Sequence, residues 1–388
     1  MSDSLKHFLQ ARLADTNARN LYRRRRVVEG AHGVQARVDG ADLTLFCSND
    51  YLGLATHPAL MAAMAKAAHA QGVGSGASQL ITGHNQAHQA LERELAEYLQ
   101  RERALLLSSG YLANVGVISA LMGREDHIFS DALNHASLID GIRLSRAKVL
   151  RYPHADLAVL QDELRQHQAA HRLIVSDAVF SMDGDVADLP GLSRLAAEHD
   201  AWLMVDDAHG LGVLGPQGRG AVAAAGLDAE AVPVLTATLG KSLGAAGAFV
   251  AGGADLIEAL IQSTRTFIFS TALPPAVAEA ARVGLRLSRD EQWRRDKLFE
   301  LIAYFREGAA QRGLPVAGSQ TAIQPLLLGE EQRALAVSEK LLAQGFLVSA
   351  IRPPTVPAGT SRLRITLSAA HERAQVTALL DALARVLL

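Results

Sequence analysis

The sequence is poor in cysteine, with Cys47 the single one among 388 residues. One cysteine cannot close an internal disulfide and cannot by itself supply a cysteine-type zinc site. The chain also lacks a basic N-terminal segment followed by an apolar one, and no stretch approaches ~18 uninterrupted apolar residues. These absences argue against export, membrane spanning and a metal site, and they predict a protein of the reducing cytoplasm.

The sequence also lacks an excess of either charge, because 38 lysines and arginines stand against 40 aspartates and glutamates. No overall basic field is available to draw the protein onto a phosphate backbone, so nucleic acid is not an expected partner. Hydrophobic residues make up 49% and charged residues 20%, which is typical of a folded globular protein. At one domain per about 150 residues, the length predicts two or three units.

Short apolar runs alternate with amphipathic segments along much of the chain. One amphipathic segment, residues 87–99, places its apolar side chains at i, i+4 and i+8 on one face of a helix. The runs have the length and flanking residues of buried strands, and they lie at residues 173–175, 202–205, 234–235 and 249–251. This alternation predicts an α/β protein with a largely parallel central sheet covered on both faces.

The pattern changes near residue 285, where charged helical sequence is followed by short apolar runs and a terminal helix. We predict a smaller C-terminal α+β domain over residues 286–388 and a large domain over residues 47–285. An N-terminal segment, residues 1–46, is expected to pack with the small domain. The arginines at 23–26 are interpreted as a solvated helix face, with binding of an anionic ligand as the alternative.

Two carboxylates and an imidazole follow one predicted strand, at Asp206, Asp207 and His209. Ligands of open α/β sheets bind at the carboxyl ends of strands, and the next strand leads to Lys241 among small residues. Desolvation lowers the pKa of a lysine and makes its nucleophilic amine accessible. An amine for a Schiff base and a carboxylate for the pyridine nitrogen are what pyridoxal 5′-phosphate requires. Taken alone, each residue has an ordinary alternative: a surface lysine, a loop-ordering acid and a histidine satisfied by the backbone.

A phosphate group needs hydroxyls or the backbone N–H groups of a helix N-terminus. Gly110 and Tyr111 open a predicted helix over residues 112–122, and Thr238 lies three residues before the lysine. Each feature alone would be an ordinary cap. Residues 210–215 match the dinucleotide pattern G-x-G-x-x-G, but a proline and further glycines follow where a helix should begin. We therefore reject the hypothesis that the chain is a nicotinamide-dependent dehydrogenase.

Four segments occur in the order of one enzyme family: residues 47–54 (CSNDYLGL), 180–185 (FSMDGD), 206–210 (DDAHG) and 236–244 (TATLGKSLG). On these segments the chain resembles the α-oxoamine synthases, fold-type-I pyridoxal-phosphate enzymes that condense an amino acid with an acyl thioester and release CO2. The resemblance covers nearly the whole chain and implies a large domain with a mostly parallel sheet, a smaller α+β domain and a homodimer. It also suggests that residues 72–83 and 269–271 complete the partner's site, with ordinary loop packing as an equal alternative.

Residues 350–357 (AIRPPTVP), together with 206–210, resemble the family member that joins L-alanine to a pimeloyl thioester in biotin synthesis. The implied partners are L-alanine and pimeloyl-CoA or pimeloyl-acyl carrier protein, and the sequence leaves the choice of carrier open. Another member such as glycine C-acetyltransferase is the alternative within the family. A pyridoxal-phosphate-binding protein without turnover is the alternative outside enzymes, and the intact lysine, acid and histidine argue against it.

Carried over position by position, the resemblance implies four catalytic residues: Lys241, His135, Asp206 and His209. Lys241 would form the Schiff base, Asp206 would hold the pyridine nitrogen and His135 would stack on the ring. His209 and Ser181 would contact the ring oxygen, and the implied phosphate contacts are Gly110, Tyr111 and Thr238. Tyr111 departs from the phenylalanine usual in the family, and its extra hydroxyl has no assigned role.

The resemblance also implies a set of substrate contacts. Asn49 and Arg364 would bind the substrate carboxylate, with Arg352 and Thr355 close to the same group. One arginine of the N-terminal run, for which Arg23 is our choice, is expected to help bind the acyl substrate. His135 completes this implied set.

Overall fold

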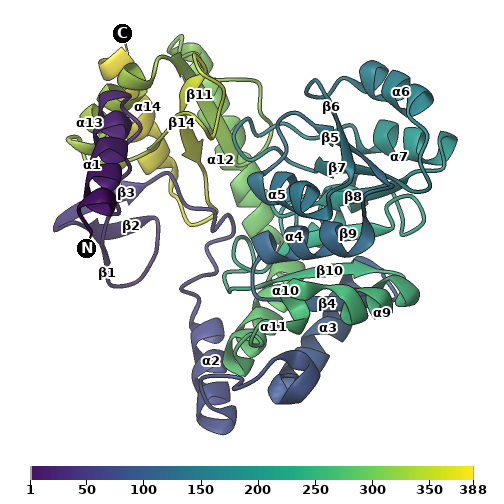
Figure 1. Ribbon diagram of the computed structural model, residues 1–388. Coiled ribbons are helices and arrows are strands. Elements are labelled where there is room, and N and C mark those ends of the chain that lie inside the picture. The colour runs from purple at the N-terminus through teal and green to yellow at the C-terminus, as the bar shows by residue number, and fades with distance from the viewer. Residues whose placement is uncertain (1, 388) are drawn as a thin grey trace. The chain divides into compact units, whose positions relative to one another are not determined.

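The computed structural model describes residues 2–387 and divides the chain into two compact units (Figure 1). The large unit comprises Asp50–Ser181 and Asp185–Asp296. The small unit comprises the described residues up to Asn49, the segment Met182–Gly184 and the described residues from Lys297 onward. The predicted boundaries lie near residues 46 and 285, and the grouping of residues 182–184 with the small unit was not predicted.

A seven-stranded sheet organises the large unit, in the order β4-β10-β9-β8-β7-β5-β6. The neighbours from β9 to β6 pair in parallel, whereas β10 pairs antiparallel with both β9 and β4. The strands are β4 (Arg103–Leu107), β5 (His127–Asp131), β6 (Lys148–Tyr152), β7 (Arg172–Asp177), β8 (Trp202–Asp206), β9 (Val234–Thr238) and β10 (Ala248–Gly252). The predicted α/β class with a mostly parallel sheet is therefore confirmed.

Helices cover both faces of this sheet. Successive residues of a strand point to opposite sides, so each buried strand contributes apolar side chains to two cores. Ile174 and Leu203 pack into a core with residues of α3, α6, α7 and α11, while Leu173 and Met204 pack into a second core with α4, α5 and α9. Figure 1 shows α6 and α7 beside the sheet across from α4 and α5. The helices are α2 (Pro58–Gln71), α3 (Gln86–Leu99), α4 (Gly110–Leu121), α5 (Ala136–Ser145), α6 (Leu157–Gln166), α7 (Leu189–Glu198), α8 (Ala221–Ala224), α9 (Ala254–Ser263), α10 (Arg265–Ile268) and α11 (Pro275–Asp290), with a π-helical turn η1 (Gln79–Gly83) and a 3-10 turn η2 (Pro216–Gly218).

The small unit contains two separate sheets, ordered β1-β2-β3-β12 and β11-β14-β13. Their strands are β1 (Val28–Glu29), β2 (Gln35–Val38), β3 (Ala41–Leu45), β11 (Ile323–Gly329), β12 (Phe346–Leu347), β13 (Ser349–Ile351) and β14 (Ser361–Thr366). The helices are α1 (Asp3–Ala18), α13 (Glu331–Leu342) and α14 (Arg373–Leu387), and α12 (Gln292–Gln311) runs from the large unit into the small one. None of the helices within residues 2–387 combines the length and the apolar character needed to cross a bilayer.

The arginine run at 23–26 does not lie on a helix, so the interpretation as a helix face was wrong. Helix α1 ends at Ala18, and Asn20 takes a left-handed conformation with φ of 56°. A left-handed residue ends a helix because the backbone can no longer continue the i to i−4 hydrogen bonds. The run therefore lies in irregular chain between α1 and β1, and its side chains are exposed.

His371 in the small unit is buried, and its two ring nitrogens contact backbone groups. Its Nε2 lies 3.0 Å from the Leu45 carbonyl, Nδ1 accepts a hydrogen bond from Ser368 N at 3.0 Å, and the ring stacks on Phe46 at 4.3 Å. Burial lowers the pKa of His371 to about 4, although the hydrogen bond with the Leu45 carbonyl opposes this shift. The unfolded chain therefore binds a proton near pH 6.5, where the folded protein does not.

We predict that this histidine makes the fold sensitive to acid. The free energy of unfolding should fall as the pH drops from 6.5 toward 4, by up to about 3 kcal/mol from this group alone. His371→Gln keeps a hydrogen-bonding side chain but cannot titrate, so its stability should change less over the same range. Urea unfolding of both proteins at the two ends of the range measures the difference. Parallel pH curves would contradict a buried neutral imidazole.

Candidate functional site

The carboxyl ends of the parallel strands gather the polar residues of the large unit. Asp177 ends β7, Asp206 ends β8 and Thr238 ends β9, and Asp177 and Asp206 pair directly across the two strands. This edge of an open α/β sheet is where ligands bind, because helix N-termini and loops meet there. Lys241 follows β9 by three residues, so the topology brings it to the same edge.

Lys241, His209 and Tyr51 form a hydrogen-bonded row. Lys241 Nζ lies 2.8 Å from His209 Nε2, and the other ring nitrogen lies 2.7 Å from the hydroxyl of Tyr51. Tyr51 is buried, which fixes the imidazole in one orientation. The amine of Lys241 and the imidazole of His209, both predicted from the sequence, are therefore in direct contact. Tyr51 lies in the segment that carried the family resemblance, but sequence analysis gave it no role.

Asp206 is buried at the end of β8 and has both oxygens bound. Oδ2 accepts a hydrogen bond from Asn114 Nδ2 at 2.6 Å, and Oδ1 accepts one from Ala208 N at 2.9 Å. The side-chain oxygen of Asn114, Oδ1, accepts a hydrogen bond from Thr236 Oγ1 at 2.8 Å. Asn114 was not among the predicted site residues. A lone amide in the otherwise apolar helix α4 was the available signal.

Asp207 has a different environment from its neighbour. Its Oδ2 accepts a hydrogen bond from Ala221 N at 2.7 Å. A Cβ added at Gly210 or Gly220 would lie 2.1 Å or 2.0 Å from its carboxylate oxygens. Burial raises its pKa to about 8, opposed by the backbone hydrogen bond from Ala221. Asp207 therefore orders a glycine-rich turn, and these glycines serve close packing rather than the binding of a dinucleotide.

His135 caps the N-terminus of α5 at the same edge of the sheet. Its backbone N donates to Asp177 Oδ2 at 2.6 Å, and its Nδ1 lies 2.7 Å from Ser137 Oγ. Desolvation lowers the pKa of His135, while Asp206 opposes the shift and Lys241 adds to it. A neutral imidazole with its position set through the backbone suits stacking on a flat ring. Asp177, which holds this backbone, was not among the predicted residues.

The start of α4 and the end of β9 form a small polar cradle. Ser109 caps α4 by accepting a hydrogen bond from Leu112 N at 3.3 Å, and the position of a Cβ on Gly110 would lie 3.8 Å from Thr238 Cβ. Thr238 Oγ1 accepts a hydrogen bond from Gly240 N at 3.2 Å. A glycine there leaves room beside the first-turn N–H groups of the helix, which favour an anion. The set of donors fits a phosphate group.

The hydroxyl of Tyr111 has a partner in the structure. It donates to Asp140 Oδ2 on α5, and this bond raises the pKa of Tyr111. Asp140 also accepts a hydrogen bond from Arg143 Nη1 at 3.1 Å. The departure from phenylalanine therefore adds a link between α4 and α5 rather than a further contact for the phosphate.

The predicted substrate-carboxylate contacts meet within the small unit. Arg364 on β14 is buried, and its Nη1 donates to Asn49 Oδ1 at 3.1 Å. The two residues are 315 positions apart in the sequence. A guanidinium oriented by an amide is suited to a two-pronged contact with a carboxylate.

Arg352 connects Thr355 with the chain around Arg23 in the small unit. The guanidinium of Arg352 donates to the carbonyls of Asn20 and Tyr22, just after helix α1. Burial lowers the pKa of Arg352, and the nearby charge of Arg23 adds to the shift. Thr355 is exposed and donates its backbone N to the Arg352 carbonyl at 3.1 Å. The structure thus couples Arg352 to the chain around Arg23, while Arg364 is paired with Asn49.

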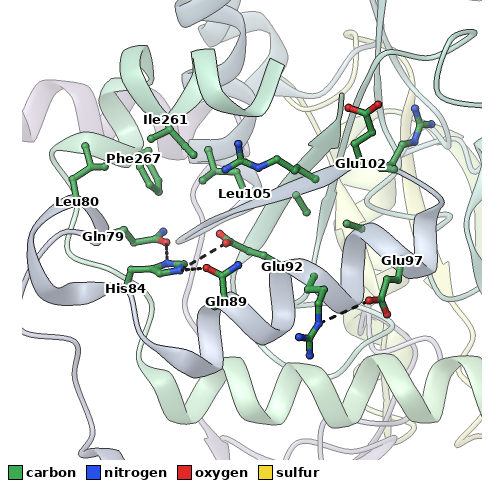
Figure 2. A pocket seen from close by; sticks show the side chains of 15 residues that line it. Gln79, Leu80, His84, Gln89, Glu92, Glu97, Glu102, Leu105, Ile261 and Phe267 are labelled. Atoms are coloured by element: carbon green, nitrogen blue, oxygen red, sulfur yellow. Dashed lines mark hydrogen bonds and ion pairs between the residues drawn. The ribbon is translucent and has the colours of Figure 1, made fainter. Parts of the chain in front are cut away.

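A cavity of about 530 Å³ opens elsewhere in the large unit, and none of the predicted catalytic, cofactor or substrate residues lines it, although Gln79 and Leu80 of the 72–83 segment do (Figure 2). Glu92 accepts a hydrogen bond from Leu106 N at 2.9 Å, and Gln79 Nε2 donates to Leu106 O at 2.9 Å. Leu106 belongs to β4, the edge strand of the sheet. The two side chains therefore satisfy backbone groups that an edge strand would otherwise expose, and we interpret this cavity structurally.

Comparison with known proteins gives a consistent picture. The family described as aminotransferase class I and II matches residues 41–383. The 8-amino-7-oxononanoate synthase of Nitrosococcus oceani is 57% identical over 97% of this chain and 100% of its own length. That of Methylococcus capsulatus is 57% identical over 96% of both chains.

Solved structures show the same relationship at the level of the fold. A serine palmitoyltransferase from S. paucimobilis with a bound PLP–myriocin aldimine matches 99% of this chain and 98% of its own, with a TM-score of 0.93 at 29% identity. An 8-amino-7-oxononanoate synthase from Francisella tularensis matches 88% of this chain and 97% of its own, with a TM-score of 0.78 at 31% identity.

The environments of the two aspartates predict different consequences of the same substitution. Asp206→Asn should lower kcat at least about a hundredfold, because an amide cannot supply the charge that stabilises a protonated ring nitrogen. Asp207→Asn should stay within about tenfold of wild type, because its carboxyl orders a turn and an amide oxygen can still accept from Ala221 N. Steady-state assays of both variants measure the losses. Equal losses would mean that the wrong acid was assigned to the ring.

Proposed function

The chain belongs to the class I and II aminotransferase family and, within it, to the 8-amino-7-oxononanoate synthases, and on that basis we propose its reaction. It is a fold-type-I, pyridoxal-phosphate-dependent acyltransferase of biotin biosynthesis. The reaction joins Cα of L-alanine to the carbonyl carbon of a pimeloyl thioester, releases the carrier thiol and loses the alanine carboxylate as CO2. The observation that carries this proposal is the contact of Lys241 with His209 beside the buried carboxylate of Asp206.

The residues at the sheet edge fit pyridoxal 5′-phosphate. The open space beside Gly110, the hydroxyl of Thr238 and the first turn of α4 would hold its phosphate. Asp206 would hold a proton on the ring nitrogen, and Ser181 and His209 would bind the ring oxygen. When bound, the cofactor supplies an electron-accepting ring that stabilises negative charge at the amino acid Cα.

Lys241 and its neighbours carry out the proton transfers. Lys241 Nζ takes the proton from Cα of alanine and returns one to the same carbon after CO2 has left, which makes it the general acid and base. His209, held by Tyr51, orients the amine from 2.8 Å. The imidazole of His135 would stack on the cofactor ring, and in that position it would limit access of water to Cα.

Arg364 and Asn49 supply the binding site for the alanine carboxylate. The guanidinium binds both carboxylate oxygens as a planar fork, and Asn49 keeps it aligned. The acyl substrate, or the part of the substrate next to the alanine carboxylate, is bound by Arg23, Arg352 and Thr355. The basic, exposed chain at residues 23–26 supports contact with an anionic donor such as a CoA or carrier thioester.

We also propose a homodimer with shared sites, located in the cytoplasm as the single cysteine suggests. Residues 72–83 and 269–271 carry exposed apolar side chains, with Val73 81%, Ile81 74% and Phe269 71% exposed. An isolated β-bridge joins Ser78 to Thr271, so the two segments form one surface. Apolar side chains gathered on one surface favour association with a second subunit.

The proposed activity is tested with purified holoenzyme, L-alanine and either pimeloyl-CoA or pimeloyl-acyl carrier protein. Release of thiol and CO2 in equal amounts is expected with at least one donor, and comparing the two identifies the carrier. Lys241→Ala should have no measurable turnover, whereas Lys340→Ala, at an exposed lysine of α13, should match wild type. Borohydride reduction should mark Lys241. Marking of another lysine, or turnover only with glycine and acetyl-CoA, would contradict the proposal.

Mixing two inactive variants tests the shared site. A Lys241→Ala subunit retains Thr271, and a Thr271→Arg subunit retains Lys241, so each hybrid dimer contains one intact site if Thr271 acts across the interface. After unfolding and refolding together in equal amounts, activity should return to about one quarter of wild type. Each variant refolded alone provides the baseline. Mixtures that stay at this baseline would place Thr271 outside the partner's site.

A further inference from the structure

The chain between β7 and α7 forms a short hairpin that carries Ser181. Val179 and Val186 form an isolated antiparallel bridge, and Phe180 N donates to Asp185 O at 3.0 Å. Beyond this neck, residues 182–184 group with the small unit, while Ser181 and Asp185 belong to the large unit. The neck therefore determines where Ser181 leaves the sheet edge.

His154 lies at this neck, in the loop after β6. Its Nδ1 lies 3.0 Å from Asp131 Oδ1, and its Nε2 lies 2.9 Å from Asp185 Oδ2. Asp131 ends β5, is buried and also accepts a hydrogen bond from Ala155 N at 2.9 Å. The imidazole meets the Phe180 ring edge-on, at 4.4 Å between centroids. One side chain thus joins the ends of β5 and β6 to both arms of the hairpin.

We propose that His154 is a positioning residue that clamps the hairpin neck to the sheet and so holds Ser181 against the cofactor ring. The proposal rests on the proposed function, because it assumes that Ser181 binds the ring oxygen. Nothing in the family resemblance or the predicted site residues pointed to His154. Its partners lie 23 and 31 positions away, beyond the reach of any local sequence pattern.

The charge on the imidazole explains why a histidine is needed there. Hydrogen bonds to Asp131 and to Asp185 raise the pKa of His154 to about 10, so both ring nitrogens carry protons near neutral pH. Two N–H groups on opposite sides of a rigid ring can donate to two carboxylates at once. Glutamine has its donors on a single nitrogen and cannot span both acids. Among the described residues, no group of histidine, cysteine and acidic side chains is arranged to hold a metal ion, and we assign this cluster a positioning role.

A double-mutant cycle tests the proposal through cofactor binding, without any substrate. The variants are His154→Gln, Ser181→Ala and the two combined, and the readouts are the dissociation constant of pyridoxal phosphate and the visible spectrum of the bound cofactor. His154→Gln should weaken binding about tenfold, as expected for a lost charged hydrogen bond, and shift the spectrum in the same direction as Ser181→Ala. The combined variant should bind no more weakly than Ser181→Ala alone, since both changes remove one contact.

His171→Gln is the matched control. Its imidazole also pairs with an aspartate, at 2.9 Å from Asp126, but at the opposite ends of the strands. It should leave binding and spectrum unchanged. Asp185→Ala removes the carboxylate on the hairpin side of the same clamp. It should weaken cofactor binding by a similar factor, so the test does not depend on the folding of His154→Gln alone.

Independent, additive effects in the cycle would overturn the proposal, as would a variant that only lowers the melting temperature of the apoprotein. If the wild-type protein binds the cofactor but does not turn over L-alanine, the proposed function is contradicted instead. The double-mutant cycle would still report on the position of Ser181, because it measures cofactor binding alone.

Discussion

The hydrogen bond from Asn114 to the buried carboxylate of Asp206 is the contact on which the rest of the site depends. Asn114 uses both ends of its amide, because the nitrogen also donates to Ser137 and the oxygen accepts from Thr236. It therefore ties the end of β8 to α5 and to β9, the strand that leads to Lys241. A buried polar network of this kind permits one arrangement, since loss of any partner would leave an unpaired group away from water.

The pleat of β8 explains why two adjacent acids have different environments. Met204 packs into the core on the side of α4, and Val205 packs into the core on the opposite face. Asp206 has the parity of Met204 and meets Asn114 on α4, whereas Asp207 has the parity of Val205 and meets the backbone of Ala221. A shift of one residue in this strand would exchange the two acids, so the register of the sheet also sets the chemistry of its edge.

Local pattern accounts for what could be predicted from the sequence. Periodicity predicts the short strands and the helix over residues 87–99. Chain order predicts that Asp206 and Lys241 follow the ends of strands. The structure contains all of these features. Asn114 and Tyr51 were missed because their partners lie 92 and 158 positions away, and no period connects them. The helix expected over the arginines at 23–26 failed because a single residue, Asn20, turns the backbone into the left-handed region, which composition does not reveal.

The fold of this protein indicates which cofactor it can bind, whereas its sequence indicates which substrates it selects. Serine palmitoyltransferase shares the architecture, so the sheet and its cofactor edge are compatible with more than one acyl donor and amino acid. The architecture alone therefore does not select the acyl donor or the amino acid. In the small unit, Arg352 binds the carbonyls of Asn20 and Tyr22 and fixes the start of the basic segment that contains Arg23. Residues 350–357, on which the resemblance to one family member partly rests, include this arginine. The same segment therefore also orders the chain proposed to contact the acyl donor.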